Sequence, residues 1–301
     1  MSAGELSAPL HRSVLLKECI EALAPVSGRL YVDGTLGLGG HTEAILERSA
    51  PDGRVVAFEW DEEALRRSGE RLQKFGERLV VVRRNFAELR EGLTELGISR
   101  IDGLLLDVGV SSMQLDQASQ RGFSFQRDEP LDMRMDNRRP LTARAILATA
   151  SESELADIFY YYGEERQARP IAAAIAARRQ KEDIVTTAQL VALVAGAVPR
   201  RFHPKNIHVA TKVFQALRIA VNGELENLAT AIDDAVPLLA EGARVAVISF
   251  HSLEDRIVKR KFLANEGLAV VTRTPVLASA EETAANPRAR SARLRVAERR
   301  N

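Results

Sequence analysis

Apolar runs alternate with amphipathic stretches over the first third of the chain. The runs are continuously apolar, which is typical of strands that are covered on both faces of a sheet. The stretches between them repeat apolar residues at the spacing of helices. Strands that alternate with helices predict a parallel, doubly wound α/β sheet. The predicted strands are 30–33, 54–60, 79–83 and 101–108, and the predicted helices are 13–23, 42–49, 62–75 and 86–96.

The alternation stops after the fourth predicted strand. Residues 114–139 are polar and irregular, and only helical patterns follow from residue 141 to about residue 221. A helical stretch of this length between strand-rich segments predicts an all-helical domain inserted into the α/β domain. The predicted α/β domain consists of residues 1–125 and 210–301, and the predicted insertion consists of residues 126–209.

Strand patterns return toward the C-terminus. A strand is predicted at 244–250, behind a predicted helix at 224–240. Two last apolar runs, 268–272 and 293–297, are expected to pair antiparallel at the edge of the sheet. The tail 286–301 holds six arginines against one glutamate, so we expect it to contact phosphate.

The turn after the first predicted strand is rich in glycine. Asp33 ends the strand, and four glycines stand between it and the helix that begins near His41. Glycine lacks a Cβ atom and accepts positive φ, so a ligand can approach the backbone closely. The start of the next helix offers unpaired N–H groups. Such a turn typically holds a nucleotide-like cofactor at the carboxyl end of a parallel strand. The four glycines are Gly34, Gly37, Gly39 and Gly40.

The spacing of the turn favours one cofactor over another. The dinucleotide fingerprint G-x-G-x-x-G fits poorly, because Thr42 takes the place of its third glycine. The pattern D-x-x-x-G-x-G fits Asp33, Gly37 and Gly39. An acid at the strand end suits a ligand with a cationic amine and no pyrophosphate, and S-adenosyl-L-methionine is such a ligand. Glu59 ends the next strand about twenty residues further on, where it can accept hydrogen bonds from a ribose.

Other strand ends also carry candidate side chains. Asp107 ends a leucine-rich strand, where it can accept hydrogen bonds from the cofactor or from a substrate amine, or cap the next segment. Phe86 follows the third strand, where its ring could stack on adenine or pack in the core. The segment 121–136 mixes aromatic, basic and acidic residues, which suits an unpaired base and its backbone or a solvated loop. His251 and a basic cluster follow the predicted strand 244–250.

The composition limits the class of protein. The chain has 301 residues, 46% hydrophobic and 28% charged, as in soluble globular proteins, and it has no apolar run long enough to span a membrane. Its single cysteine, Cys19, excludes an internal disulfide and lies in an apolar helical pattern, so we expect a packed thiol. No metal site is predicted, because His203 and His208 lack metal-ligand spacing. The N-terminus lacks the pattern of a signal peptide, and we expect a cytoplasmic location.

Eight segments together resemble one family, the bacterial small-subunit ribosomal RNA cytosine-N(4)-methyltransferases. The resemblance runs from about His11 to the C-terminus and covers almost the whole chain. Two departures are Glu59, where many members have aspartate, and Val209, where members commonly have proline. The segments are Asp33-Gly-Thr-Leu-Gly-Leu-Gly-Gly-His41, Leu104-Leu-Leu-Asp-Val-Gly-Val-Ser-Ser112, Arg121-Gly-Phe-Ser-Phe125, Leu131-Asp-Met-Arg-Met-Asp136, Tyr162-Gly-Glu-Glu-Arg166, Phe214-Gln-Ala-Leu-Arg-Ile219, Ser249-Phe-His-Ser-Leu-Glu-Asp-Arg256 and Asn286-Pro-Arg-Ala-Arg-Ser291.

The resemblance implies a Rossmann-like class I methyltransferase sheet with an inserted helical domain that contacts RNA. It implies S-adenosyl-L-methionine as the methyl donor. The implied acceptor is the exocyclic N(4) amine of one cytidine in the decoding region of 16S rRNA, within the small ribosomal subunit. A homodimer is left open, and no membrane partner is expected. The implied cofactor contacts are Gly39, Gly40, His41, Glu59, Phe86, Asp107 and Gln114.

The chemistry of methyl transfer suggests two further residues. A cytosine amine is a poor nucleophile, and it improves when an acceptor takes a proton as the attack proceeds. Asp132 and His251 are our candidates for this acceptor. We expect residues 107–112 and 123–136 to form the pocket for a flipped base.

Three other classes of protein share parts of this pattern. An NAD-dependent oxidoreductase has a similar fold, but Thr42 argues against it. A DNA methyltransferase usually has a proline-proline-aromatic turn after the fourth strand, whereas this chain has Asp107-Val-Gly-Val-Ser-Ser. A non-catalytic ribosome assembly factor could retain the fold, although acids at three strand ends favour a working cofactor site.

Overall fold

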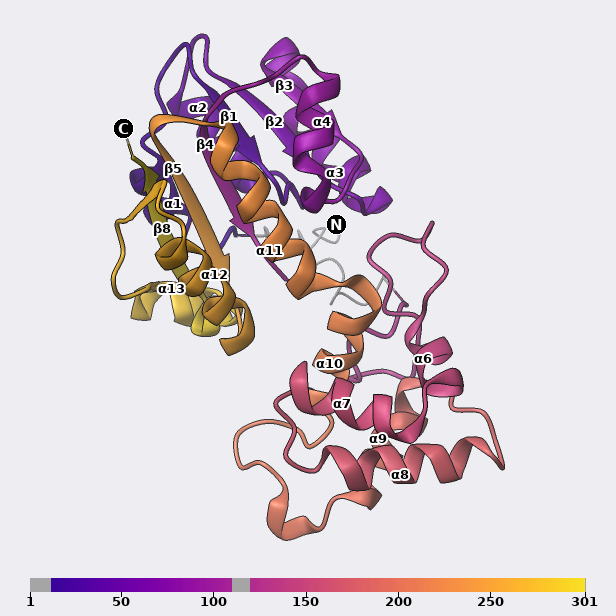
Figure 1. The fold of residues 1–301 in the computed structure, drawn as a ribbon. Helices are drawn as coiled ribbons and strands as arrows, with labels where there is room; N and C mark the ends of the chain where they lie inside the picture. Colours follow the sequence, from indigo (N-terminus) through magenta and orange to yellow (C-terminus); the bar gives the residue numbers. More distant parts are fainter. Residues whose placement is uncertain (1–11, 110–119, 301) are drawn as a thin grey trace, which may run out of the picture. The chain divides into compact units, whose positions relative to one another are not determined.

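The computed structural model describes residues 12–109 and 120–300 (Figure 1). The chain divides into two compact units. The first unit consists of residues 1–109 and 226–301, and the second of residues 110–225. The domain boundaries predicted from sequence lay about 16 residues further along at the first junction and 16 residues earlier at the second.

The first unit contains one eight-stranded sheet with the order β3-β2-β1-β4-β5-β8-β6, and β7 pairs with β8. The pairs among β1 to β5 are parallel, and β8 runs antiparallel to β5, β6 and β7. The predicted antiparallel pairing of the last two apolar runs is confirmed. The strands are β1 Leu30–Asp33, β2 Arg54–Phe58, β3 Leu79–Val82, β4 Ile101–Asp107, β5 Leu239–Ser249, β6 Leu268–Val270, β7 Val276–Leu277 and β8 Arg293–Arg299.

The register of the parallel strands brings their carboxyl ends to one edge of the sheet. Asp33 on β1 pairs with Ala57 on β2 and with Leu105 on β4. Asp107 is the last residue of β4, and Glu59 comes directly after β2. The three strand-end acids therefore lie along the same edge, which is where open α/β sheets bind their ligands.

Helices cover both faces of this sheet (Figure 1). One apolar core joins the sheet to α4, α11 and α12, and the other joins it to α1, α2 and the end of α3. Cys19 on α1 is fully buried in the second core, and burial raises the pKa of its thiol, as expected for a packed cysteine. The helices are α1 Leu16–Leu23, α2 Gly40–Arg48, α3 Glu62–Leu72, α4 Leu89–Glu95, α11 Glu224–Ala235, α12 Ser252–Ala264 and α13 Ala280–Ala285.

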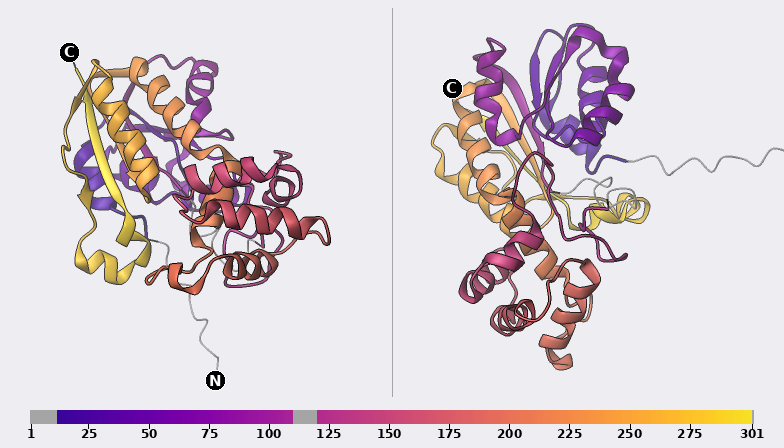
Figure 2. Two further views of the ribbon diagram at one scale, coloured as in Figure 1. Left: turned by 60° about the horizontal axis from the view of Figure 1, so that its bottom comes forward. Right: turned by 90° about the vertical axis from the view of Figure 1, so that its right-hand side faces the viewer.

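The described part of the second unit is helical, as Figures 1 and 2 show. Its only strand-like pairing among the described residues is an isolated bridge between Pro130 and Thr186. Ser151 and Thr186 begin α7 and α9 with capping boxes, in which the cap side chain and the third helical residue exchange hydrogen bonds. The helices are α6 Ala143–Thr149, α7 Glu152–Tyr161, α8 Ala168–Arg179, α9 Thr187–Ala197 and α10 Thr211–Asn222.

One sequence prediction in the first unit was wrong. The helix predicted at 224–240 ends at Ala235, and β5 begins at Leu239. Pro237 lies between them in a short 3-10 helix, Val236–Leu238, and lacks the N–H that an α-helix interior needs. Residues 293–299 of the arginine-rich tail form β8, and the phosphate contact expected of this tail stays a prediction. Arg295 is 6% exposed, and its guanidinium donates to Asp255 over 2.6 and 3.1 Å.

No helix in the described part of the chain is both long enough and apolar enough to cross a membrane.

Candidate functional site

Asp33 organises the glycine-rich turn between β1 and α2. It is 1% exposed. One carboxylate oxygen accepts a hydrogen bond from the Thr35 N–H over 3.0 Å, and the other accepts from the Thr42 hydroxyl over 2.7 Å. Because both carboxylate oxygens of Asp33 accept hydrogen bonds from the glycine-rich turn, Asp33 stabilises the conformation of this turn. The hydroxyl of Thr42 thus bonds the strand-end acid at the position where a dinucleotide fingerprint would have its third glycine.

Contacts within the protein explain why three of the turn residues are glycine. A Cβ atom on Gly34 would lie 2.3 Å from the Leu106 side chain, and one on Gly39 would lie 2.7 Å from Leu72. A Cβ on Gly40 would lie 2.0 Å from the Ser13 hydroxyl oxygen. Gly39 also has a φ of 80°, which disfavours residues with side chains. The turn is therefore pressed close against the sheet, α3 and the segment before α1.

Glu59 ties the end of β2 to the same turn. Its carboxylate accepts hydrogen bonds from the N–H groups of Gly37, Trp60 and Asp61 at 2.8–2.9 Å. Burial raises the pKa of Glu59 to about 7, and the N–H donors oppose this shift. Protonation of Glu59 therefore occurs near neutral pH.

Asp107 lies beside the buried ring of His41 at the start of α2. The His41 Nδ1 is 3.9 Å from one Asp107 oxygen, while its Nε2 is 3.1 Å from the Val14 carbonyl oxygen. The Asp107 N–H donates to the Thr35 hydroxyl over 2.6 Å, which connects this strand end to the turn. Burial raises the pKa of Asp107 to about 6, against the opposing charges of His41 and Arg288.

Asp107 also has an oxygen that is free to accept. Its Oδ1 is buried and has no hydrogen-bond partner among the described residues. A buried acceptor without a donor is costly, so the atom is suited to a hydrogen bond from a bound amine or hydroxyl.

Phe86 lies close to Gly34 of the glycine-rich turn. It begins a short 3-10 helix, Phe86–Glu88, which Asn85 caps by accepting from the Ala87 N–H over 2.7 Å. A Cβ atom on Gly34 would lie 3.1 Å from the Phe86 Cβ, so a side chain at position 34 would crowd Phe86. The structure therefore brings Phe86 together with the turn and the strand-end acids.

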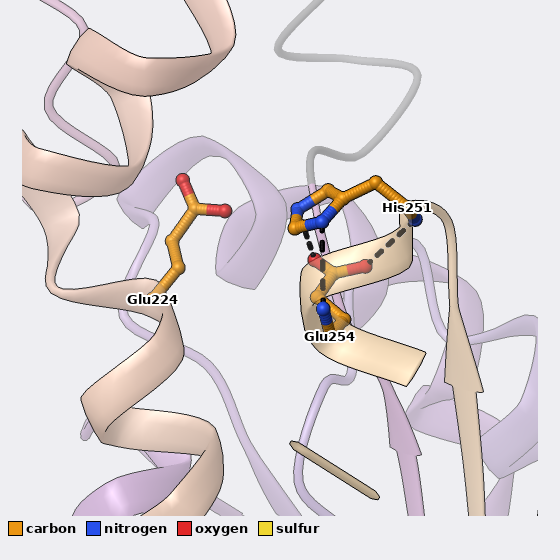
Figure 3. Close-up of side chains that lie close together, drawn as sticks. All are labelled: Glu224, His251 and Glu254. Atoms are coloured by element: carbon orange, nitrogen blue, oxygen red, sulfur yellow. Dashed lines mark hydrogen bonds and ion pairs between the residues drawn. The ribbon is translucent and has the colours of Figure 1, made fainter. Parts of the chain in front are cut away.

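His251 is the N-cap of α12, directly after β5 (Figure 3). Its Nδ1 accepts from the Glu254 N–H at 3.5 Å, and its Nε2 lies 3.1 Å from a Glu254 carboxylate oxygen but has no hydrogen bond. Glu254 accepts from the N–H groups of Phe250 and His251 at 2.7 and 3.2 Å, completing a capping box.

Asp132 belongs to the second unit and is already paired. It accepts from Nε, Nη2 and the backbone N–H of Arg134 at 2.7–3.0 Å. Burial opposes the effect of Arg134, but the net result is a lowered pKa. A carboxylate held in this way is a weak proton acceptor. The remaining predicted contact, Gln114, lies outside the described residues.

The residues at the sheet edge fit S-adenosyl-L-methionine. The ligand combines a cationic amine, a ribose and an adenine, and the edge offers a free buried acceptor on Asp107, an acid on Glu59 and a ring on Phe86. The parallel sheet, its antiparallel β8 and the helices on both faces define a class I methyltransferase fold.

Comparison with known proteins agrees with this class. A model of the MraW methylase family matches residues 8–300. The ribosomal RNA small subunit methyltransferase H of Desulfotalea psychrophila is 66% identical over 290 residues, which cover 96% of this chain and 98% of that protein. The protein of the same name from Geotalea uraniireducens is 52% identical over 307 residues, with the same coverage.

One solved structure supports the fold at low sequence identity. A presumed rRNA methylase from Clostridium thermocellum superposes with a TM-score of 0.50 at 11% identity, covering 96% of this chain and all of that one. The chain belongs to the MraW methylase family and is an S-adenosyl-L-methionine-dependent methyltransferase.

Two threonines that sequence reasoning missed help to build the site. Thr35 and Thr42 both bond Asp33, and Thr35 also accepts from the Asp107 N–H. Their spacing from Asp33, two and nine residues, was visible in the sequence. The bond that joins Thr35 to β4 spans 72 residues and was not.

Proposed function

We propose that this enzyme methylates the exocyclic N(4) amine of one cytidine in the decoding region of 16S rRNA, on the small ribosomal subunit in the cytoplasm. The observation that carries the proposal is the 66% identity, over nearly the whole chain, to a protein named ribosomal RNA small subunit methyltransferase H. The motifs that resemble the cytosine-N(4)-methyltransferase family support the identity of the base.

The cofactor would be held by the edge of the sheet. Glu59 would accept hydrogen bonds from the ribose, Phe86 would pack on the adenine, and Asp107 Oδ1 would accept from the amine. The backbone of Gly37, Gly39 and Gly40 and the ring of His41 would line the rest of the site, with Gln114 as a further contact. Asp33 would hold the turn in place. S-adenosyl-L-methionine supplies an electrophilic methyl group bound to sulfur.

The residues of the chain must then position the cytidine amine and accept its proton. An in-line displacement requires the nitrogen, the methyl carbon and the sulfur to be collinear, so positioning provides most of the acceleration. Of our two candidates for the proton acceptor we favour His251. Its Nε2 would take the proton in the tautomer that carries its hydrogen on Nδ1, and this tautomer gives up the 3.5 Å contact from the Glu254 N–H. Asp132 is the weaker base, because Arg134 already occupies its oxygens.

Substitutions distinguish these roles. His251→Asn keeps an N-cap residue for α12 but removes the base, since asparagine caps helices well. We expect this variant to lower kcat by about a hundredfold or more and to leave the Kd for S-adenosyl-L-methionine unchanged. Asp132→Asn should have a much smaller effect on kcat. Near-normal turnover by His251→Asn would refute the assignment and leave His251 with a capping role alone.

The substrate is tested by transfer of labelled methyl groups to small subunits from cells that lack this modification, beside naked 16S rRNA. We expect incorporation of one methyl group per subunit and less on naked RNA, because the near-neutral net charge of +1 suggests recognition of an assembled structure. Equal incorporation on naked RNA would refute the requirement for the subunit. No incorporation on either, with cofactor binding intact, would refute the proposed substrate.

A further inference from the structure

A short loop in the helical unit combines exposed cations with an exposed aromatic ring. The loop, residues 200–205, reads Arg-Arg-Phe-His-Pro-Lys and begins with a 3-10 helix, Arg200–Phe202. Phe202 is 50% exposed, and the guanidinium carbon of Arg201 lies 4.9 Å from its ring centroid. Arg200 and Lys205 are also exposed.

The backbone of this loop is held in one conformation. The N–H groups of Phe202 and His203 donate to the carbonyl oxygens of Pro199 and Arg200 over 2.8 and 3.1 Å. The His203 Nε2 lies 2.9 Å from the Val198 carbonyl oxygen. His203 therefore helps to fix the loop to the end of α9. A loop organised in advance loses little conformational entropy on binding.

Within the part of the chain that the structure describes, the cations of the loop have no acidic partners. Arg200, Arg201 and Lys205 form no ion pair among the described residues. The sequence explains this, because residues 184–223 contain no aspartate or glutamate. Two exposed arginines elsewhere in the same unit, Arg144 and Arg178, are paired with acids.

Arg144 lies on α6 and Arg178 near the end of α8. Arg144 donates to Asp183 over 3.1 Å, and Arg178 pairs with Glu182. The loop therefore has a local positive charge that the net charge of +1 for the whole chain conceals. Such a charge attracts a polyanion.

We propose that the loop 200–205 binds single-stranded RNA, with Phe202 stacked on an unpaired base and the three cations on neighbouring phosphates. This inference rests on the proposed rRNA substrate and adds a contact surface for it. An exposed ring flanked by cations suits RNA better than an acidic protein, because every base offers a face for stacking. The loop would contribute to the affinity for the RNA substrate.

Binding of a fluorescein-labelled, mixed-sequence single-stranded RNA to the full-length chain tests the proposal. We expect Phe202→Ala to raise the Kd about fivefold or more, since stacking accounts for at least this factor per base. In the double variant Arg200→Gln/Arg201→Gln, the slope of log Kd against log salt should fall by about 1.4, because each phosphate contact contributes roughly 0.7 on a single strand.

The matched control is the double variant Arg144→Gln/Arg178→Gln. It removes the same charge from exposed positions of the same unit, and we expect both its Kd and its salt slope to stay near those of the wild type. All variants should melt at the wild-type temperature and bind S-adenosyl-L-methionine normally, because the loop lies outside the cofactor site.

The outcomes separate this proposal from the proposed function. If wild-type protein methylates 16S rRNA but the loop variants bind the RNA as it does, the loop proposal is overturned and the function stands. If both double variants weaken binding equally, the effect is one of total charge and the proposal is also overturned. If the loop variants lose affinity for the subunit alone, the loop contacts a ribosomal protein instead. If wild-type protein binds RNA through the loop but transfers no methyl group to it, the proposed function fails and the binding surface remains.

Discussion

The protonation of Glu59 should control the affinity for S-adenosyl-L-methionine. Its carboxylate lies at the end of β2, where it accepts three backbone N–H groups and has a pKa raised by burial to about 7. In the proposed site a ribose hydroxyl would donate to the ionised form, so we expect the cofactor to bind best when Glu59 is charged. The apparent affinity should therefore rise as the pH increases through 7.

The magnitude follows from the fraction of ionised Glu59. With a pKa of about 7, about a tenth of the molecules are ionised at pH 6 and about nine-tenths at pH 8. If only the ionised form binds, the apparent Kd falls about tenfold between these two pH values. Asp107, with a pKa of about 6, adds a smaller dependence of the same sign.

Calorimetric titration of S-adenosyl-L-methionine at pH 6, 7 and 8 measures this dependence, with Glu59→Gln as the reference. The variant lacks the titrating group but keeps Asp107, so the ratio of the two Kd values isolates Glu59. We expect weaker binding by the variant at pH 8 and a ratio that shrinks about tenfold toward pH 6. A ratio that is constant across this range would refute the reasoning.

Three further substitutions test the packing that supports the two units. Asn222→Ala removes the acceptor of the Met135 N–H, and should lower the free energy of unfolding by about 1–3 kcal/mol in urea. Arg295→Met removes both hydrogen bonds of a nearly buried guanidinium to Asp255, which keeps only the 3.4 Å contact with Arg293, and should cost about 3 kcal/mol in the same assay. Gly34→Ala places a methyl group 2.3 Å from a buried leucine, and should cost about 1–3 kcal/mol and weaken cofactor binding. Wild-type unfolding curves would contradict these expectations.

Much of the first unit could be predicted because its signals are local. The strand Leu30–Asp33 has the predicted bounds, since a short apolar run ended by an acid and glycines allows few other readings. The three strand-end acids follow from the same logic, because parallel strands bring their carboxyl ends to one edge. The strand β5 begins earlier than predicted, because the apolar run before it has no helical or strand period of its own.

Long-range pairing could not be read from the sequence. The arginines of the C-terminal segment resemble a phosphate-binding tail, yet Arg295 pairs with Asp255, 40 residues earlier in the chain. The pairing of Asp132 with Arg134 is local in the sequence. Its bidentate geometry could still not be predicted, because it depends on how the loop folds. In contrast, the lack of aspartate and glutamate in residues 184–223 is visible in the sequence. The structure adds that the ring of Phe202 is exposed.

The central claim is that the chain transfers a methyl group to the N(4) amine of a cytidine. The most direct test is nucleoside mass spectrometry of 16S rRNA, taken from unmodified small subunits after incubation with the enzyme and S-adenosyl-L-methionine bearing a deuterated methyl group. We expect one labelled N(4)-methylcytidine in a single fragment of the decoding region. A labelled nucleoside of any other kind, or no label while the cofactor still binds, would contradict it.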